Sequence, residues 1–219
     1  MKDLRLLTKI VKAGYNYLCD ALKVKQKNNE NYSSVSHREV KMIQYQYNIK
    51  KALEAVLFLI SKAGNIDKYQ LVKTMYFADE YHLNKYFRPV LGDNYVAMDY
   101  GPVGSGVKDI LDKEDLAIEE LKEEMPFEQI GLNYSTPKRP PNLRKLSKSD
   151  VEALEYGWNF VKDKSFDELK EITHNKIAYK NARENSTSNA PLMNYVDMLN
   201  EANKAKSEEI FTCAEHMVL

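Results

Sequence analysis

The sequence predicts an α+β fold that is predominantly helical: a compact helical domain with a small antiparallel β-sheet or hairpin. Apolar residues recur every three or four positions along much of the chain, as they do on the buried face of an amphipathic helix. The chain has only eight glycines in 219 residues, which fits a helix-rich protein. One central stretch, residues 88–103, instead combines β-favouring residues with Gly and Pro.

Two parts of different character are expected. Residues 1–44 are predicted to form an N-terminal helical extension and a linker, since an amphipathic stripe over 3–24 is followed by a polar run over 25–36. Residues 45–219 are predicted to form the main domain, which includes a C-terminal helix. A hydrophobic share of 43% is enough for a globular core.

Two long helices are expected at the start of the main domain. Ser36 and Glu39 have the spacing of a capping box, which predicts a helix from there to Ala63. Gly64 would end this helix. A second helix is predicted over 67–86, ending before Arg88-Pro89 because the residue before proline disfavours helix.

The stretch 88–103 is predicted to be a hairpin or a short antiparallel sheet. It has a turn signal at Gly92-Asp93 and a β-favouring run, Tyr95–Tyr100, that we expect to end at Gly101-Pro102. The remaining elements follow from periodicity and from two more capping boxes, Ser147–Asp150 and Ser165–Glu168. Helices are expected over about 104–112, 115–123, 148–163, 166–173 (continuing past His174) and 192–216, with a strand over 127–134 and an exposed loop over 136–145.

Charge and cysteine content restrict the function classes. The formal net charge is zero, which gives no general argument for attraction to nucleic acid or membranes, although residues 1–50 are locally basic. Two distant cysteines, Cys19 and Cys213, exclude a disulfide framework. No secretory leader is visible, and no apolar run approaches the ~18 residues of a membrane span. We therefore expect a cytoplasmic protein without membrane contact.

The glycines at 101, 104 and 106 resemble a phosphate loop only superficially. A Walker loop needs Lys where Val107 stands, and a dinucleotide fingerprint needs Gly where Asp109 stands. Both motifs also belong to parallel βαβ units, whereas the strand here is predicted to be antiparallel. We therefore expect the glycines to permit a tight turn between strand and helix.

Catalysis finds little support in the residues. Asp79 and His82 share one helix face and could act as metal ligands or as an oriented base. His174 is the one plausible distant partner, which leaves a metal-dependent hydrolase as a third hypothesis. A structural role for these residues is the simpler interpretation, so neither a catalytic site nor a bound metal or other cofactor is predicted.

Residues 66–112 contain a run that resembles the signature of a known protein family. The run from Lys73 to Leu111 resembles the signature of the Panacea domain of SocA-like antitoxins, and residues 171–174 resemble its Leu-Thr-His element. The resemblance covers roughly residues 45–184. It departs from the pattern at Tyr179, where Trp is common, and at Gly104, where Pro is frequent; residues 1–44 have no counterpart. The matching positions are Lys73, Tyr76, Phe77, Ala78, Asp79, His82, Leu83, Arg88, Pro89, Gly92, Asp93, Tyr95, Val96, Ala97, Tyr100, Gly101, Pro102 and Val103.

The resemblance implies a non-enzymatic bacterial or phage antitoxin that neutralises a cognate toxin by direct protein–protein binding, with delivery to a protease, or a chaperone contact, as a further option. A DNA-binding autoregulator that uses the basic N-terminal region is the alternative hypothesis, and a homodimer is also conceivable. The partner-binding surface is expected on the 76–103 helix–hairpin unit. Its candidate residues are Tyr76, Asp79, His82, Arg88, Asp93, Tyr100, Gly101, Pro102 and Val103.

Overall fold

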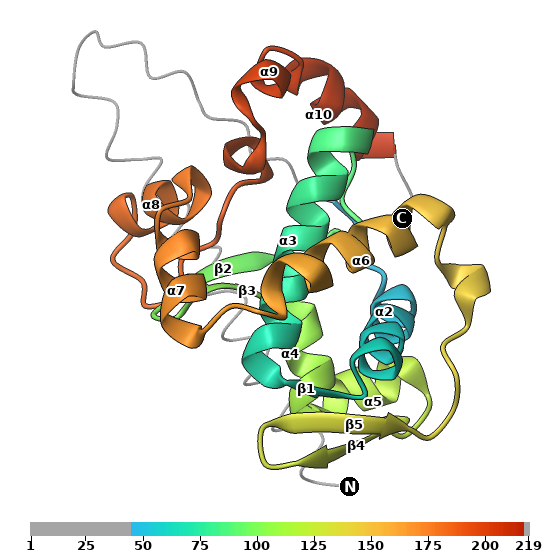
Figure 1. The fold of residues 1–219 in the computed structure, drawn as a ribbon. Coiled ribbons are helices and arrows are strands. Elements are labelled where there is room, and N and C mark those ends of the chain that lie inside the picture. Colours follow the sequence, from blue (N-terminus) through green and yellow to red (C-terminus); the bar gives the residue numbers. More distant parts are fainter. Residues whose placement is uncertain (1–44, 217–219) are drawn as a thin grey trace, which may run out of the picture. The chain divides into compact units, whose positions relative to one another are not determined.

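The computed structural model describes residues 45–216, apart from the side chains of residues 211, 213, 215 and 216 (Figure 1). The predicted helix over 3–24, the linker and the Ser36 capping box lie outside the described residues. None of the helices in the described part combines the length and apolar character needed to cross a bilayer.

The described residues form a predominantly helical α+β fold, as predicted. The helices are α2 (Ile49–Ala63), α3 (Lys68–Tyr86), α4 (Ser105–Asp112), α5 (Asp115–Leu121), α6 (Lys148–Val161), α7 (Phe166–His174), α8 (Ile177–Glu184), α9 (Glu201–Lys204) and α10 (Ser207–His216), with 3-10 turns at Leu143–Lys145 and Tyr195–Met198. The strands are β1 (Asn65–Asp67), β2 (Tyr95–Met98), β3 (Gly101–Gly104), β4 (Phe127–Ile130) and β5 (Asn133–Pro137).

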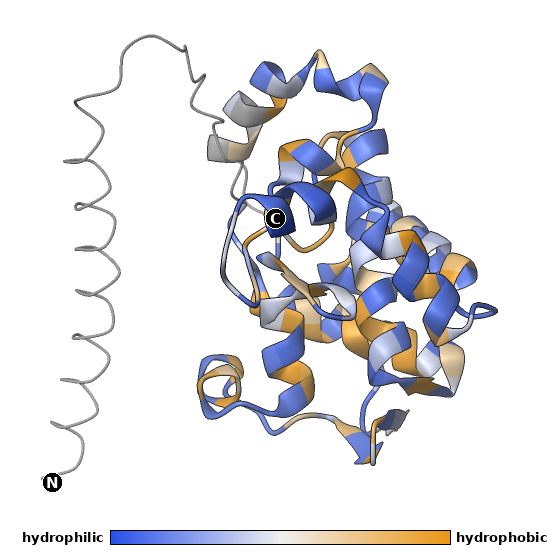
Figure 2. Cartoon of the chain, turned by 90° about the vertical axis from the view of Figure 1, so that its left-hand side faces the viewer, coloured by the Kyte–Doolittle hydropathy of each residue, from blue (hydrophilic) through white to orange (hydrophobic). Residues whose placement is uncertain are grey.

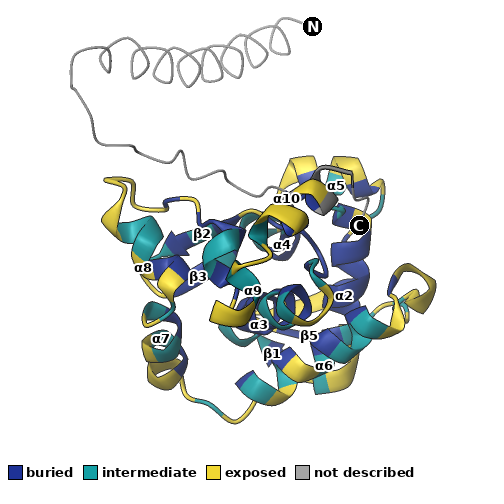
Figure 3. Ribbon diagram, turned by 90° about the horizontal axis from the view of Figure 1, so that it is seen from above, coloured by how far each residue is buried: buried dark blue, intermediate teal, exposed yellow. Residues whose placement is uncertain are grey.

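Helix α3 lies at the centre of the domain and contributes to two hydrophobic cores (Figures 1 and 3). Leu71 and Met75 face a core shared with α2, α4 and β5, whereas Phe77 and Leu83 face a second core built around β2 and residues 193–199. The buried residues of α3 lie on most sides of the helix, as expected of an element at the centre of a domain. The other helices show the alternation of hydrophobic and hydrophilic residues expected of amphipathic helices (Figure 2).

The packing of α6 on α3 depends on a glycine. Helix α6 packs along α3, and a Cβ atom at Gly157 would lie 2.4 Å from the carbonyl oxygen of Thr74. Only a residue without a side chain allows this approach. The pair fixes α3 relative to the segment that leads to α7.

The strands form two antiparallel sheets. Strands β1, β5 and β4 form a three-stranded sheet in that order, and β2 pairs with β3 in a hairpin. In the hairpin, Met98 lies opposite Gly101, so Asp99 and Tyr100 form its turn. The turn predicted at Gly92-Asp93 is therefore wrong, and the segment 101–104 forms a strand rather than ending one.

The helix predicted from Ser36 to Ala63 begins later than expected. Residues 45–48 are not helical, and α2 starts after Asn48, whose side chain accepts a hydrogen bond from the amide of Lys51 (3.1 Å). This is an N-cap contact that stops the helix from extending backwards. Tyr45 instead packs edge-on against Tyr195, with ring centroids 5.0 Å apart.

The C-terminal prediction of one helix over 192–216 is wrong. Leu192 forms an antiparallel bridge with Val96, and the amide of Met193 donates to the Tyr95 carbonyl (2.8 Å). Backbone groups committed to β2 are not available for a helix. Asn194 and Asn200 then cap two short separate segments.

The other predicted elements either agree with the structure or are divided there into two shorter elements. Helix α3 and both capping boxes, at α6 and α7, are confirmed. The strand predicted over 127–134 is a hairpin of β4 and β5, and β5 extends into the expected loop as far as Pro137. The helical run expected past His174 is interrupted at Asn175 and Lys176, after which α8 begins.

Candidate functional site

The nine predicted partner-binding residues lie on α3, the following loop and the β2–β3 hairpin, but their exposure differs. Tyr76, Asp79, His82 and Asp93 are buried. Gly101 and Pro102 are also buried, whereas Arg88 and Val103 are partly exposed. Tyr100, at the tip of the hairpin, is 60% exposed and is the one large apolar side chain of the set that faces outward.

Asp79 closes the loop between α3 and β2. Its Oδ1 atom accepts hydrogen bonds from the backbone amides of Val90 (2.8 Å) and Leu91 (3.1 Å), and its Oδ2 atom accepts one from the Tyr95 hydroxyl (3.1 Å). Burial raises the pKa of Asp79 to about 7, although these three donors favour the charged form. The carboxyl group thus ties the loop to the middle of α3.

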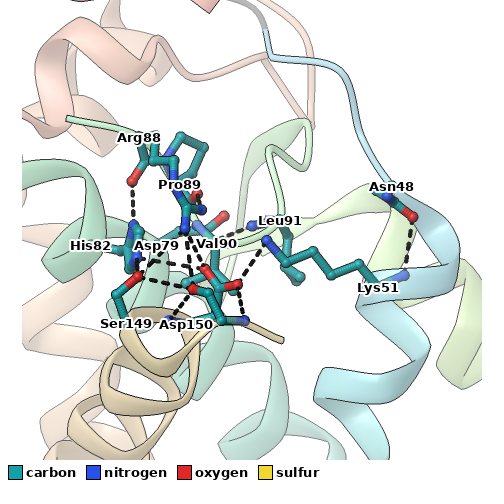
Figure 4. A network of polar contacts seen from close by, with 11 residues as sticks. Asn48, Lys51, Asp79, His82, Arg88, Pro89, Val90, Leu91, Ser149 and Asp150 are labelled. Carbon is teal, nitrogen blue, oxygen red and sulfur yellow. Dashed lines mark hydrogen bonds and ion pairs between the residues drawn. The ribbon is translucent and has the colours of Figure 1, made fainter. Parts of the chain in front are cut away.

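His82 is held as a neutral ring in the same region (Figure 4). Its Nδ1 atom lies 2.6 Å from the carbonyl oxygen of Arg88, and its Nε2 atom lies 3.0 Å from the Ser149 hydroxyl. Since a carbonyl only accepts, Nδ1 carries the proton and Nε2 accepts from Ser149. Burial lowers the pKa of His82, which also favours the neutral form.

Asp150 connects three parts of the domain in this network (Figure 4). It lies 3.0 Å from Lys51 on α2 and 3.0 Å from Arg88 in the loop, and it forms the capping box of α6 with Ser147. Burial opposes its charge, but the two cations and the Ser147 amide hold its pKa below the usual range. The Asp150 carboxylate is therefore compensated by cations of the same chain.

Asp93 occupies the N-terminus of α4. Its two carboxylate oxygens accept hydrogen bonds from the amides of Gly106 and Val107, both at 2.8 Å. Burial raises its pKa to about 6, against the effect of these amides. The helix N-terminal donors that a phosphate would need are thus taken by a side chain of the same chain, which agrees with the rejection of a phosphate loop.

The three residues of the metal-site hypothesis are not brought together. His174 stacks on Tyr179, with ring centroids 4.4 Å apart, whereas Asp79 and His82 make the loop contacts given above. Among the described residues, no group of three or more His, Cys, Asp or Glu side chains is arranged to hold a metal ion.

An apolar pocket of about 520 Å³ opens beside the hairpin turn. Five separate segments contribute to it: the first turns of α3, the β2–β3 hairpin with α4, the turn between β4 and β5, the start of α7, and the loop before Leu192. Its lining residues are Lys68, Tyr69, Val72, Lys73, Met98, Asp99, Tyr100, Val103, Lys108, Leu132, Phe166, Asn189 and Ala190.

Lys73 lies in the wall of this pocket and is only 1% exposed. Its ammonium group donates to the carbonyl oxygen of Pro102 (2.8 Å) and lies 4.9 Å from the ring centroid of Tyr69. No carboxylate of the described residues pairs with it. Burial lowers its pKa to about 7. A buried lysine without a carboxylate is costly in free energy.

Aromatic side chains surround the mouth of the pocket. The rings of Tyr69 and Phe166 lie 4.5 Å apart, and those of Tyr100 and Phe166 lie 5.4 Å apart. Phe166 is 44% exposed, and the Lys170 ammonium lies 5.5 Å from the Tyr100 ring. Exposed aromatic groups of this kind are common at protein-binding surfaces.

A second pocket of about 620 Å³ differs in its charge balance. It lies between α3, α8 and residues 197–200. Its Glu80 pairs with Lys176 (2.7 Å), and the Asn84 side chain donates to the Met198 carbonyl (2.9 Å). Because Glu80 is paired with Lys176 and Asn84 is hydrogen-bonded to Met198, these groups are less available to a charged ligand than Lys73 is in the first pocket.

The predicted binding residues overlap with the lining of this pocket only in part. Tyr100 and Val103 were predicted and line the pocket, whereas Tyr69, Lys73 and Phe166 were not predicted as binding residues. Lys73 was visible as a position of the family signature. A lysine among apolar residues of a central helix was the available signal for its burial.

Comparison with known families identifies the domain. Residues 71–179 match the family model described as Antitoxin SocA-like, Panacea domain, a shorter range than the expected 45–184. No curated protein and no solved structure matches the chain significantly. The matched range includes Lys73, the β2–β3 hairpin and Phe166. Through residues 71–179, the chain belongs to the SocA-like antitoxin family of Panacea domains.

Proposed function

We propose that this protein is an antitoxin that neutralises a cognate toxin by direct protein–protein binding, without catalysis and without a cofactor. The family assignment supports the antitoxin role. The contacts within the chain that occupy the side chains of Asp79, His82 and Asp150 support a structural scaffold rather than a reaction centre. The proposal places the protein in the cytoplasm, where a toxin would be synthesised.

The observation that carries the proposal is the aromatic surface around the hairpin turn. Tyr100 and Phe166 are exposed, contact each other and border an apolar pocket. Large apolar groups that surround a pocket are typical anchors of a protein interface. A stable complex buries roughly 1,600 Å² in total, so the toxin would also cover the surface around this pocket.

The other predicted site residues would support this surface from below. Gly101, Pro102 and Val103 form the second strand of the hairpin and hold Tyr100 at its tip. The buried residues Tyr76, Asp79, His82 and Asp93, together with Arg88, connect the hairpin and its preceding loop to α3, α4 and α6. In this proposal the buried residues shape the surface and do not themselves touch the toxin, whereas Val103 lines the pocket.

Co-expression tests the proposal. The full chain would be produced together with the product of the adjacent gene, and host growth and co-purification would be measured. We expect restored growth and a stable complex. Restored growth with disappearance of the toxin would instead favour delivery to a protease, with or without a chaperone.

A harmless neighbour that does not co-purify would contradict the antitoxin proposal. The DNA-binding alternative would then be tested by measuring binding to duplex DNA over a range of salt concentrations, because phosphate contacts weaken steeply as salt rises.

A further inference from the structure

We propose that the pocket at Lys73 is the anchor site for one element of the toxin: an aromatic or aliphatic side chain with a carboxylate beside it. This inference rests on the proposed function and adds the chemistry of the contact. The apolar wall would receive the side chain, and the Lys73 ammonium would receive the carboxylate.

The size and lining of the pocket fit an apolar side chain. Its volume of about 520 Å³ lies within the ~300–1,000 Å³ typical of ligand pockets. Val72, Met98, Val103 and Leu132 provide aliphatic contacts. The aromatic rings at its mouth add flat apolar surface, which favours an aromatic or branched occupant.

The charges around the pocket are unequal, with cations in excess. Lys68 and Lys108 share one carboxylate, that of Asp112. Asp99, the acidic residue that lines the pocket, pairs with Arg183. Lys73 therefore adds a positive charge that no carboxylate in the described part of the chain balances. An anionic group on the occupant would complement this excess.

The position of the Lys73 ammonium suits an external acceptor. The ammonium group has three N–H donors, and one of them is directed at the Pro102 carbonyl. The face of the Tyr69 ring adds a cation–π contact. The hairpin comes close to the ammonium group only because residue 101 is glycine: a Cβ atom there would lie 2.9 Å from the ammonium nitrogen. The apolar surroundings would strengthen the hydrogen bond between the ammonium group and a carboxylate that enters the pocket.

Continuity with the exposed aromatic surface favours a protein segment as the occupant. Tyr100 lines the pocket and also belongs to the surface that we propose for toxin binding. A toxin that covers Tyr100 and Phe166 would therefore have the mouth of the pocket under its interface.

Small probes test the chemistry of the pocket without the toxin. The uniformly ¹⁵N-labelled full chain would be titrated with N-acetyl-phenylalanine and with its uncharged amide, and amide resonances would be followed by NMR. We expect the acid to shift the resonances of Val72, Lys73 and Tyr100 and to bind about fivefold or more tightly than the amide. In Lys73→Met the two probes should bind equally. Absence of shifts at the pocket, equal binding by the wild type, or a preference that survives in Lys73→Met would overturn the inference.

The toxin complex provides the second measurement. Lys73→Met is expected to weaken the complex about tenfold or more, since one partner of a buried charge pair is lost. Lys62→Met is the matched control, because Lys62 pairs with Glu155 on α6 and does not line the pocket. If the toxin binds wild type and Lys73→Met equally tightly, the antitoxin role stands and the anchor site is wrong. If no toxin binds at all, the antitoxin role fails, and the probe titration still decides the pocket chemistry.

Discussion

At the scale of single residues, Lys73 combines near-complete burial with a lowered pKa and a single hydrogen-bonded acceptor, the Pro102 carbonyl. Two other buried charges in the domain are compensated: Lys51 by Asp150, and Glu54 by Arg139, whose two terminal guanidinium nitrogens each lie 3.0 Å from one carboxylate oxygen. The burial of Lys73 is therefore expected to cost more stability than the burial of these paired groups, as would be accepted for a residue that serves binding.

This difference predicts that Lys73→Met stabilises the protein near neutral pH. Methionine keeps an unbranched apolar chain in the same space and removes the cost of the buried charge, which should outweigh the lost bond to Pro102. We expect an increase of about 1–3 kcal/mol in the free energy of unfolding at pH 7, measured by chemical denaturation. Lower stability of the variant at pH 7 would show that the ammonium supports the fold instead.

The same substitution should change the dependence of stability on pH. Lys73 has a pKa of about 7 in the folded chain, against ~10.4 for an unfolded lysine, so between these values the unfolded state binds more protons. The stability of the wild type relative to the variant should therefore rise from pH 7 to pH 9. The advantage of Lys73→Met would shrink accordingly, and denaturation curves at both pH values measure this.

At the scale of elements, the β2–β3 hairpin and α4 are joined through Asp93. A Cβ atom at Gly104 would lie 2.4 Å from an Asp93 carboxylate oxygen, although the backbone of Gly104 has an ordinary φ of −73°. A side chain there would displace the carboxylate that binds the first amides of α4. This contact accounts for a glycine at position 104 in this chain.

Gly104→Ala should therefore destabilise the protein by about 2–3 kcal/mol, through overpacking and loss of the Asp93 cap. Gly131→Ala is a useful comparison, because a Cβ atom at Gly131 meets nothing within 4 Å and only its φ of +62° is unfavourable. That control should cost about 1 kcal/mol. Thermal or chemical unfolding of both variants measures the difference, and equal effects would contradict the role given to Asp93.

Two capping boxes that depend on local contacts were predictable, whereas features that depend on distant contacts were not. The capping boxes at Ser147 and Ser165 involve residues three positions apart, and both are present. Asp93 looked like a turn residue because its partners, Gly106 and Val107, are thirteen and fourteen positions away. Leu192 looked helical because its pairing with Val96 spans almost a hundred residues.

At the scale of the whole molecule, the candidate site forms where segments that are distant in the sequence meet. Tyr100, Lys73, Phe166 and Ala190 come from four segments that meet only in the folded chain. The sequence alone predicts Tyr100 and the hairpin as part of the proposed surface, because the family signature is continuous there. It gave no reason to combine them with Phe166, since the start of α7 adjoins the hairpin through tertiary packing.

The most direct test of the central claim is the affinity of the toxin for Tyr100→Ala, measured by calorimetry with the full chain. Tyr100 is 60% exposed, so the variant should fold normally and bind about tenfold or more weakly. Tyr156→Ala is the matched control, an exposed tyrosine on α6 that does not line the pocket, and it should bind like the wild type. Wild-type affinity in Tyr100→Ala would contradict the proposal that the toxin binds at the hairpin turn.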